Sequence, residues 1–402
     1  MKTARLVSAA AAALLLGAAL ATATIYARRM ETRSVHAVAP QMFGQKNQGV
    51  ALQRAAFRQP DLLPIYGSSD LNVRNRYHAS ALFRDYPTGF TVFPVGNVGS
   101  TSLIWLQALA AVGADLHGKK VAVSLPARSF MNDMVDSHAY AANFSRLQAS
   151  AFTFSTRLSF AVKQGAARRM LQYPATLAND PLLTFALEQL AAGSVSSRVL
   201  YYASVPLGTL HNVVLRLQDD WATLVFLRAQ LGWGPVPRRG APLDWTDLLS
   251  RAEQEAQRKA DNNPFGFDNA FWTANAPEIA LQKGMYPPEA VQRSVERSAE
   301  WTDLDLLLRV VRELGGDPLI LSMPMNGVYF DYLGVPLPTR RAYYERLREL
   351  AKAHGVPAID FADHDSDKYF TVDSGLHLSA KGWVYYDHAL DAFFHGQPPG
   401  NL

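Results

Sequence analysis

Three short apolar segments that end at a turn constrain the fold of this chain more than any other feature. They span residues 62–66, 90–95 and 121–125, and each is followed by a glycine-containing turn or by Pro126. The second continues into an apolar, helix-like segment over about 101–112. Short buried strands that alternate with helices are typical of a parallel sheet with crossover helices. The sequence therefore predicts an α/β fold.

The middle of the chain follows a different pattern. From about 131 to 312 it has no comparable β-branched runs, and it contains a Pro- and Gly-rich segment at 235–240 that we interpret as a loop. Strand-like segments return at 318–324 and 357–361. We therefore predict a large helical insertion over about 131–312, which would shape access to a site on the sheet.

An apolar run from Leu6 to Ile25 dominates the N-terminus. Basic side chains flank it on both sides: Lys2, Arg5, Arg28 and Arg29. The length suits one membrane-spanning helix within residues 1–29. A secretory signal peptide is the alternative, with small-residue cleavage sites at 19–21 and 21–23. The run is longer than a usual signal core, which favours an uncleaved anchor, and either interpretation exports the rest of the chain.

The exported part divides into two predicted regions. Residues 30–60 are polar and indicate a spacer that lifts the domain off the membrane. Residues 61–395 would form the extracytoplasmic domain. We expect a single-pass protein of the cell membrane whose main domain is periplasmic or on the cell surface.

Composition excludes several classes of function. The 402 residues include no cysteine, which excludes thiol catalysis, zinc–thiolate sites and disulfides. The formal net charge is only +4, and the basic residues form no clustered stripe of the kind that binds nucleic acids.

Ser69 is the first residue suited to chemistry. It lies in Gly67-Ser68-Ser69-Asp70, directly after the first predicted strand. A serine on such a turn presents its hydroxyl at the carboxyl edge of the sheet, where α/β sites form. The alternative is structural, since Ser68 or Ser69 can simply cap the helix that follows.

A histidine near the C-terminus supplies a candidate base. His377 follows Asp373 by four residues and precedes a helix that Ser379 can cap. A histidine held by a carboxylate suits a general base, because its tautomer must be fixed. The alternative is an ordinary buried histidine with a backbone partner. The other nine histidines have no such setting in the sequence, and we assign them to the surface or the core.

A glycine-containing segment after the second strand is the third candidate. It reads Gly96-Asn97-Val98-Gly99-Ser100. A glycine there can bring its N–H close to a developing oxyanion, because it has no side chain. The same glycines can equally serve only the geometry of the turn.

Together these ordered blocks, Gly-Ser-Ser, Asn-x-Gly and Asp…His, resemble the SGNH/GDSL hydrolase superfamily. Within it the chain most resembles the DltD family, the membrane-anchored proteins of teichoic-acid D-alanylation. The resemblance also rests on further blocks at 96–104, 124–130, 262–266, 325–334 and 377–383. It spans most of the exported domain and implies an SGNH-like three-layer fold.

Carried over by position, the resemblance implies a catalytic triad of Ser69, His377 and Asp373. It implies an oxyanion hole formed by the N–H groups of Ser69 and Gly99. The candidate substrate-binding residues are Ser68, Asn97, Arg128 and Asn326.

The chain departs from the superfamily pattern in two places. The acid and base are usually spaced Asp-x-x-His, whereas Asp373 lies one residue further from His377. The Gly-x-Asn-Asp block is replaced by residues 126–129, Pro-Ala-Arg-Ser. The second departure favours a specialised transferase over a general esterase.

Three functions follow as hypotheses. The first is an acyltransferase or esterase that carries a D-alanyl group on Ser69 and passes it to a cell-envelope polymer, without a metal or cofactor. The resemblance implies a membrane-bound O-acyltransferase and a D-alanyl carrier protein as its partners. The second is a polysaccharide O-acetyltransferase or esterase of the same fold. The third is a non-catalytic scaffold that binds the carrier protein.

Overall fold

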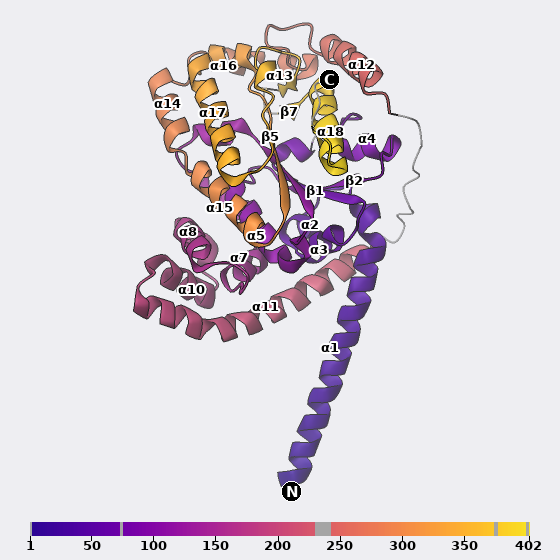
Figure 1. The fold of residues 1–402 in the computed structure, drawn as a ribbon, viewed down its shortest axis with the longest axis vertical. Helices are drawn as coiled ribbons and strands as arrows, with labels where there is room; N and C mark the ends of the chain where they lie inside the picture. The colour runs from indigo at the N-terminus through magenta and orange to yellow at the C-terminus, as the bar shows by residue number, and fades with distance from the viewer. Residues whose placement is uncertain (1, 73–74, 230–242, 374–376, 399–401) are drawn as a thin grey trace.

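A five-stranded parallel sheet lies at the centre of the molecule. A computed structural model describes residues 2–72, 75–229, 243–373, 377–398 and 402 (Figure 1). The strands are β1 (Leu62–Gly67), β2 (Thr91–Gly96), β3 (Lys120–Leu125), β4 (Asp317–Ser322) and β5 (Ala358–Ile359), in the order β2-β1-β3-β4-β5. Every neighbouring pair is parallel. This confirms the predicted α/β class.

Helices cover both faces of this sheet, because successive strand residues point to opposite sides. Leu63 and Ile65 belong to one core cluster, with α4 (Ala79–Asp85) and α18 (Ala380–His395). Leu62 and Tyr66 belong to the other, with α5 (Ser102–Val112) and α15 (Ala299–Glu313). Strands β1 to β4 are buried nearly throughout, as expected for a parallel sheet between two helical layers.

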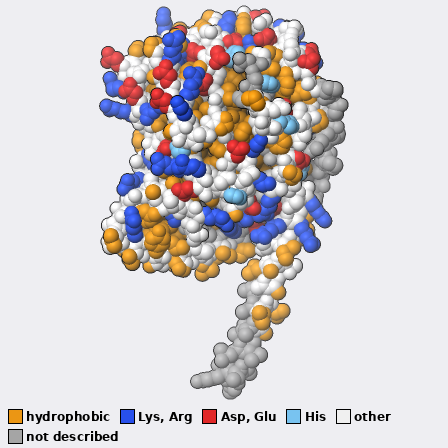
Figure 2. All heavy atoms as spheres, in the orientation of Figure 1, with side chains coloured by type: hydrophobic (Ala, Val, Ile, Leu, Met, Phe, Trp, Pro, Cys, Tyr) orange, Lys and Arg blue, Asp and Glu red, His pale blue; other side chains and the backbone are white. Residues whose placement is uncertain are grey.

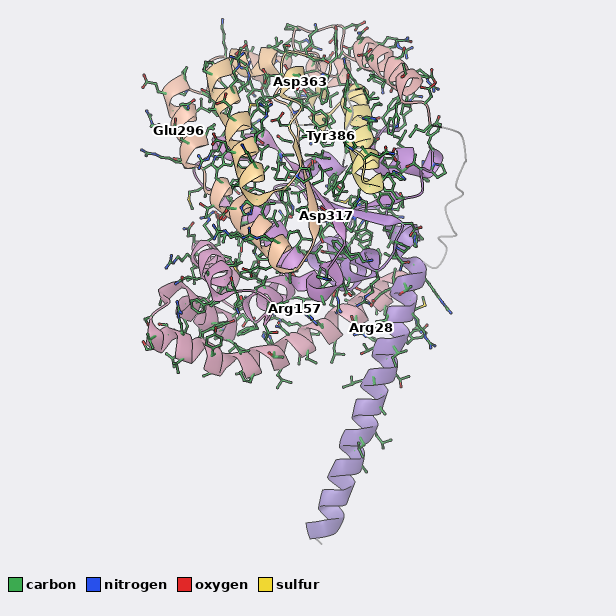
Figure 3. The ribbon with its side chains drawn as sticks, viewed as in Figure 1. Arg28, Arg157, Glu296, Asp317, Asp363 and Tyr386 are labelled. Atoms are coloured by element: carbon green, nitrogen blue, oxygen red, sulfur yellow. The ribbon has the colours of Figure 1, made fainter. Side chains whose placement is uncertain are left out.

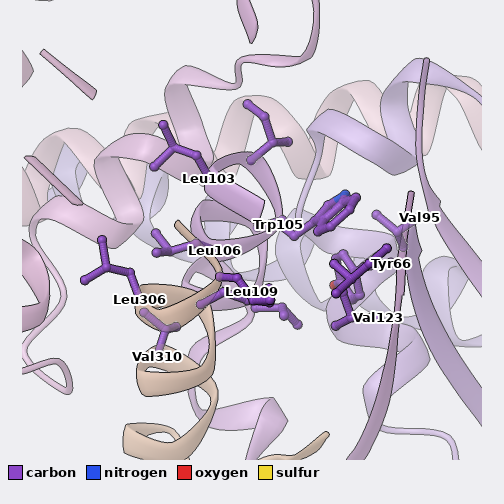
Figure 4. Close-up of a cluster of buried hydrophobic side chains, with 14 of the residues drawn as sticks. Tyr66, Val95, Leu103, Trp105, Leu106, Leu109, Val123, Leu306 and Val310 are labelled. Atoms are coloured by element: carbon purple, nitrogen blue, oxygen red, sulfur yellow. The ribbon is translucent and has the colours of Figure 1, made fainter. Parts of the chain in front are cut away.

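Helix α5 is buried on all sides. Figure 4 shows Leu103, Trp105, Leu106 and Leu109 of this helix between strand side chains and α15. All eleven of its residues are buried, which agrees with its almost uniformly apolar sequence. Its N-terminus lies just beyond β2, so its packing fixes the loop that precedes it.

The predicted helical insertion lies between β3 and β4. The described helices there are α6 (Ser137–Asn143), α7 (Arg146–Thr153), α8 (Phe160–Met170), α9 (Pro174–Leu177), α10 (Pro181–Ala192), α11 (Val195–Ala229), α12 (Trp245–Lys259), α13 (Asn269–Ala280), α14 (Pro288–Arg297) and α15. The loop predicted at 235–240 lies outside the described residues. Helices α16 (Gly327–Leu333) and α17 (Leu337–His354) follow β4.

The predicted spacer over residues 30–60 is wrong. Helix α1 (Lys2–Val38) continues through its first part, and α2 (Gly44–Gln48) and α3 (Ala51–Phe57) follow. Leu52 and Phe57 are each 1% exposed and belong to the main core. The segment is polar enough to suggest a linker, but six of the seven residues of α3 are buried, Gln53 among them.

The predicted membrane anchor lies within helix α1. Among the residues that the structure describes, no helix combines the length and the apolar character needed to cross a membrane. The membrane anchor therefore stays a prediction.

Candidate active site

Ser69 lies at the carboxyl end of β1, as predicted. The strand ends at Gly67, and a turn of 3-10 helix over Ser69–Asn72 begins immediately. A Cβ at Gly67 would lie 2.7 Å from the Leu71 side chain, so a larger residue there would displace Leu71. The Trp105 indole N–H donates to the Gly67 carbonyl at 3.1 Å. Ser69 itself is partly exposed, which leaves its hydroxyl accessible.

A short hairpin carries the histidine and its carboxylate. Strands β6 (Thr371–Val372) and β7 (His377–Leu378) are antiparallel, with Val372 opposite His377. Asp373 directly follows β6, and its oxygens lie 2.7 and 2.8 Å from His377 Nδ1. Its φ of 32° is in the left-handed region, which is uncommon for a residue with a side chain. Asp373 therefore contacts His377 although the two are one residue further apart in sequence than the superfamily pattern has them.

The three side chains form one hydrogen-bonded row. His377 Nε2 lies 3.1 Å from Ser69 Oγ, across 308 positions of sequence. The imidazole thus contacts the hydroxyl with one nitrogen and the carboxylate with the other. A hydroxyl, an imidazole and a carboxylate in this order can perform nucleophilic acyl transfer.

A second buried carboxylate lies beside the row. Asp70 is 1% exposed, and it accepts from the Ser68 N–H at 2.7 Å and from Ser124 Oγ at 2.6 Å. Burial raises the pKa of its carboxyl, and the two hydrogen bonds and the nearby charge of His377 oppose that rise. Sequence reasoning missed Asp70 and Ser124, although the position of Asp70 directly after Ser69 was a usable signal.

These carboxylates shape the titration of the histidine. Burial of the ring works to lower the pKa of His377, but the hydrogen bond and charge of Asp373 and the charge of Asp70 outweigh it. The net result is a pKa raised above the usual value of histidine. A raised pKa makes the ring a stronger proton acceptor near neutral pH.

The loop with the candidate oxyanion glycine is held firmly from two sides. Asn47 of α2 bonds both the N–H and the carbonyl of Gly96, and Asn143 of α6 donates to the Val98 carbonyl at 2.9 Å. Gly99 has a φ of 76°, and a Cβ there would lie 2.7 Å from Ala139 Cβ. The region predicted as a spacer therefore contributes directly to this loop.

The Gly99 N–H already has a partner. It donates to Ser68 Oγ at 3.1 Å, and Ser68 is 6% exposed. The predicted oxyanion donor and the predicted substrate-binding serine are thus brought together, but they contact each other. An oxyanion can accept a hydrogen bond from the Gly99 N–H only after the Ser68 hydroxyl has moved away from it.

The remaining predicted binding residues occupy different settings. Asn97 is exposed beside Gly99. Arg128 is partly buried after the carboxyl end of β3, where it donates to the Tyr286 hydroxyl at 3.2 Å. Asn326 is 1% exposed, caps α16, and donates to the Phe265 carbonyl at 2.8 Å and to Thr371 of β6 at 3.4 Å. Its contacts are internal, and they support the hairpin that carries Asp373.

The sequence-based distinction between His377 and the other histidines needs correction. His36 and His354 each lie 2.8 Å from an aspartate oxygen, of Asp61 and Asp305 respectively. An adjacent carboxylate is therefore no special property of His377. Its distinguishing feature is the serine hydroxyl on the second ring nitrogen. Among the residues that the structure describes, no three histidine or acidic side chains gather in a way that could hold a metal ion.

The chain is similar to known proteins over most of its length. A family model described as "DltD protein" matches residues 39–395. Protein DltD of Bacillus subtilis is 30% identical over 364 residues, which cover 90% of this chain and 88% of that protein. Protein DltD of Staphylococcus aureus is 24% identical over 353 residues, with 87% and 85% covered. Protein DltD of Lacticaseibacillus rhamnosus is 24% identical over 388 residues, with 95% and 88% covered.

Proposed function

This chain belongs to the DltD family, and from that premise we propose that it transfers D-alanyl groups to a cell-envelope polymer through an ester on Ser69. The family takes part in the D-alanylation of teichoic acids. The observation that carries the proposal is the hydrogen-bonded row of Ser69, His377 and Asp373 at the carboxyl edge of the sheet.

The row supplies both half-reactions. Ser69 Oγ attacks the carbonyl carbon of a D-alanyl ester while His377 Nε2 accepts the hydroxyl proton. The tetrahedral intermediate then collapses, the leaving group departs with that proton, and D-alanine remains as a serine ester. An acceptor hydroxyl repeats the sequence in reverse and regenerates Ser69. Asp373 holds the ring tautomer and stabilises the imidazolium that forms in each half.

Ser68 couples the nucleophile to the oxyanion loop in this proposal. In the free protein, its hydroxyl oxygen accepts the hydrogen bond from the Gly99 N–H. Substrate would displace that hydroxyl, and the Gly99 N–H would then donate to the oxyanion. Such a contact, made only as charge develops, favours the transition state over the ground state.

We further propose that the chain acts at the cell membrane, with its main domain outside the cytoplasm. The apolar run from Leu6 to Ile25 is the basis for an N-terminal anchor. The partners we propose are a membrane-bound O-acyltransferase and a D-alanyl carrier protein, and the acceptor is a hydroxyl-bearing envelope polymer.

Probe labelling tests the nucleophile directly. The full chain is incubated with a fluorophosphonate probe, and turnover of a D-alanyl ester is measured in parallel. We expect labelling and turnover in the parent protein and loss of both in Ser69→Ala. Ser250→Ala is the matched control, because Ser250 is an exposed serine on α12.

The remaining outcomes separate the alternatives. Turnover of p-nitrophenyl acetate without turnover of D-alanyl esters would favour a polysaccharide O-acetyltransferase or esterase. Equal labelling of the parent and Ser69→Ala would refute the serine ester and favour a scaffold that binds the carrier protein.

A further inference from the structure

Helix α11 presents apolar side chains on its outer face and buries several polar side chains, together with Tyr201, Leu215, Leu224 and Leu227, on its inner face. Its exposed residues include Val195, Val199, Tyr202, Leu207, Leu210, Val213, Trp221 and Val225. Its buried face includes Asn212, Asp219 and Thr223. The outer face of a helix that borders water is normally polar. A contiguous exposed apolar face of this kind marks an interaction surface.

The buried polar residues attach α11 to the domain. Asp219 accepts from the Val50 and Ala51 N–H groups at the start of α3, each at 2.8 Å. Asn212 donates to the Ser150 carbonyl at 3.3 Å. These contacts hold the helix in one orientation, so its apolar face is permanently turned outward. The face is a built feature of the fold.

The exposed charged residues of α11 itself are all basic. They are Arg198, Arg216 and Arg228. Its two acidic residues, Asp219 and Asp220, are buried or partly buried. An apolar helix face bordered by arginine complements a surface with an apolar interior and anionic headgroups.

The N-terminal helix extends the same surface. The Arg228 guanidinium contacts the Tyr26 hydroxyl at 3.3 Å, so α11 meets α1 at its C-terminal end. Beyond that contact, Leu14, Leu15 and Ile25 of α1 are exposed. Figure 1 shows α1 projecting from the side of the domain on which α11 lies, and Figure 2 shows hydrophobic side chains gathered on that side.

We propose that the outer face of α11 lies in the surface of a lipid bilayer, with its axis roughly parallel to the membrane. The apolar side chains enter the boundary between headgroups and acyl chains, and the arginines contact anionic headgroups. At about 1.5 Å per residue the helix is roughly 52 Å long, which gives a broad footprint. The footprint orients the domain relative to the membrane. The inference is independent of the reaction at Ser69.

Single-cysteine labelling tests the depth of this helix, since the chain has no natural cysteine. Leu210→Cys, Val213→Cys and Val225→Cys receive an environment-sensitive fluorophore in the full chain, reconstituted in phosphatidylcholine–phosphatidylglycerol vesicles. Glu296→Cys is the control, since Figure 3 places Glu296 on α14, far from α11. We expect doxyl-labelled lipid to quench the α11 labels several-fold more than the control, and aqueous iodide to show the reverse order.

Two results would overturn the proposal. Equal iodide quenching of the α11 and Glu296 labels means that α11 faces water. If the α11 fluorophores are protected from both quenchers, and more so at a higher protein-to-lipid ratio, a second copy of the chain covers the face instead.

A substitution series completes the test in the same vesicles. Leu210→Glu and Val213→Glu together, on the Val225→Cys background, should reduce lipid quenching at residue 225 several-fold. Leu281→Glu is the matched control, because Leu281 is an exposed leucine directly after α13, a helix that Figure 1 shows on the opposite side of the domain from α11. An unchanged signal in the double variant would contradict the proposal, and circular dichroism verifies that each variant is folded.

Discussion

Two histidine–aspartate pairs in this molecule have nearly the same geometry and different surroundings. His377 lies 2.7 Å from Asp373, and His354 at the end of α17 lies 2.8 Å from Asp305 of α15. The second ring nitrogen of His377 contacts Ser69 Oγ, whereas Nδ1 of His354 is buried with no hydrogen-bond partner among the described residues. A histidine–aspartate pair by itself therefore has a structural role. A nucleophile on the free side of the ring converts it into a candidate catalytic unit.

Exchanging each histidine for glutamine tests this comparison most strongly. His377→Gln should lower kcat for D-alanyl transfer by about 10⁶-fold, the scale seen when a triad base is removed. His354→Gln should leave kcat within a factor of two and should lower the free energy of unfolding by about 1–3 kcal/mol, because it disturbs a buried pair. Turnover assays and urea unfolding measure the two effects. Comparable losses of activity in both variants would contradict the assignment.

Replacing the aspartate of each pair, Asp373 or Asp305, should give the next largest difference in kcat. Asp373→Asn keeps the shape of the side chain and removes its charge, so the ring loses its fixed tautomer and kcat should fall by about 10⁴-fold. Asp305→Asn should leave kcat unchanged. The same turnover assay measures both. A mild effect of Asp373→Asn would mean that another group, such as Asp70, holds the ring.

Substitutions of two glycines test the candidate oxyanion loop beside Ser69. Gly99→Ala combines a strained backbone with a 2.7 Å contact to Ala139, so the loop must shift and its N–H moves. We expect kcat to fall by about 10²-fold, as for the loss of one oxyanion donor. Gly355→Ala is the control, since Gly355 has a similar positive φ and open space around it. It should cost about 1 kcal/mol of stability and no activity.

The smallest expected effect is a shift in the pH profile. The charges of Asp373 and Asp70 raise the pKa of His377 against the opposing effect of burial. The ring acts as a base only when neutral, so the acidic limb of kcat/KM follows this pKa. Asp70→Asn removes one negative charge, the pKa falls, and the limb should move to lower pH. An unmoved limb would mean that Asp70 is protonated in the working enzyme.

The same raised pKa has a consequence for stability. Protonated His377 is stabilised in the folded state. Its contribution to the free energy of unfolding is therefore fully present below the pKa that this histidine has in the unfolded chain. It is lost as the pH rises through the higher folded pKa. In Asp70→Asn the contribution should shrink, and urea unfolding across this pH range measures it.

The main strands were predictable because each is a short apolar run that ends at a turn residue. Ser69 and His377 were predictable as candidates because Ser69 directly follows a predicted strand and His377 precedes a predicted helix. Residues 30–60 were misjudged because their sequence is polar overall, whereas packing in the structure buries most of α3 and even Lys46 of α2. Asp70, Asn47 and Asn143 carry no periodic signal, and their importance depends on contacts between segments far apart in the chain.

The fold class could be read from the amino-acid sequence, because strand length and the alternation of strands with helices are local properties. The sequence also placed Ser69, Gly99 and His377 on the turns and short segments where such a site can form. Three features came from the folded chain alone: Asp373 contacts His377 despite its longer spacing, Ser68 Oγ accepts from the Gly99 N–H, and α11 turns its apolar face outward. These features depend on register and on packing between distant segments, which no local pattern encodes.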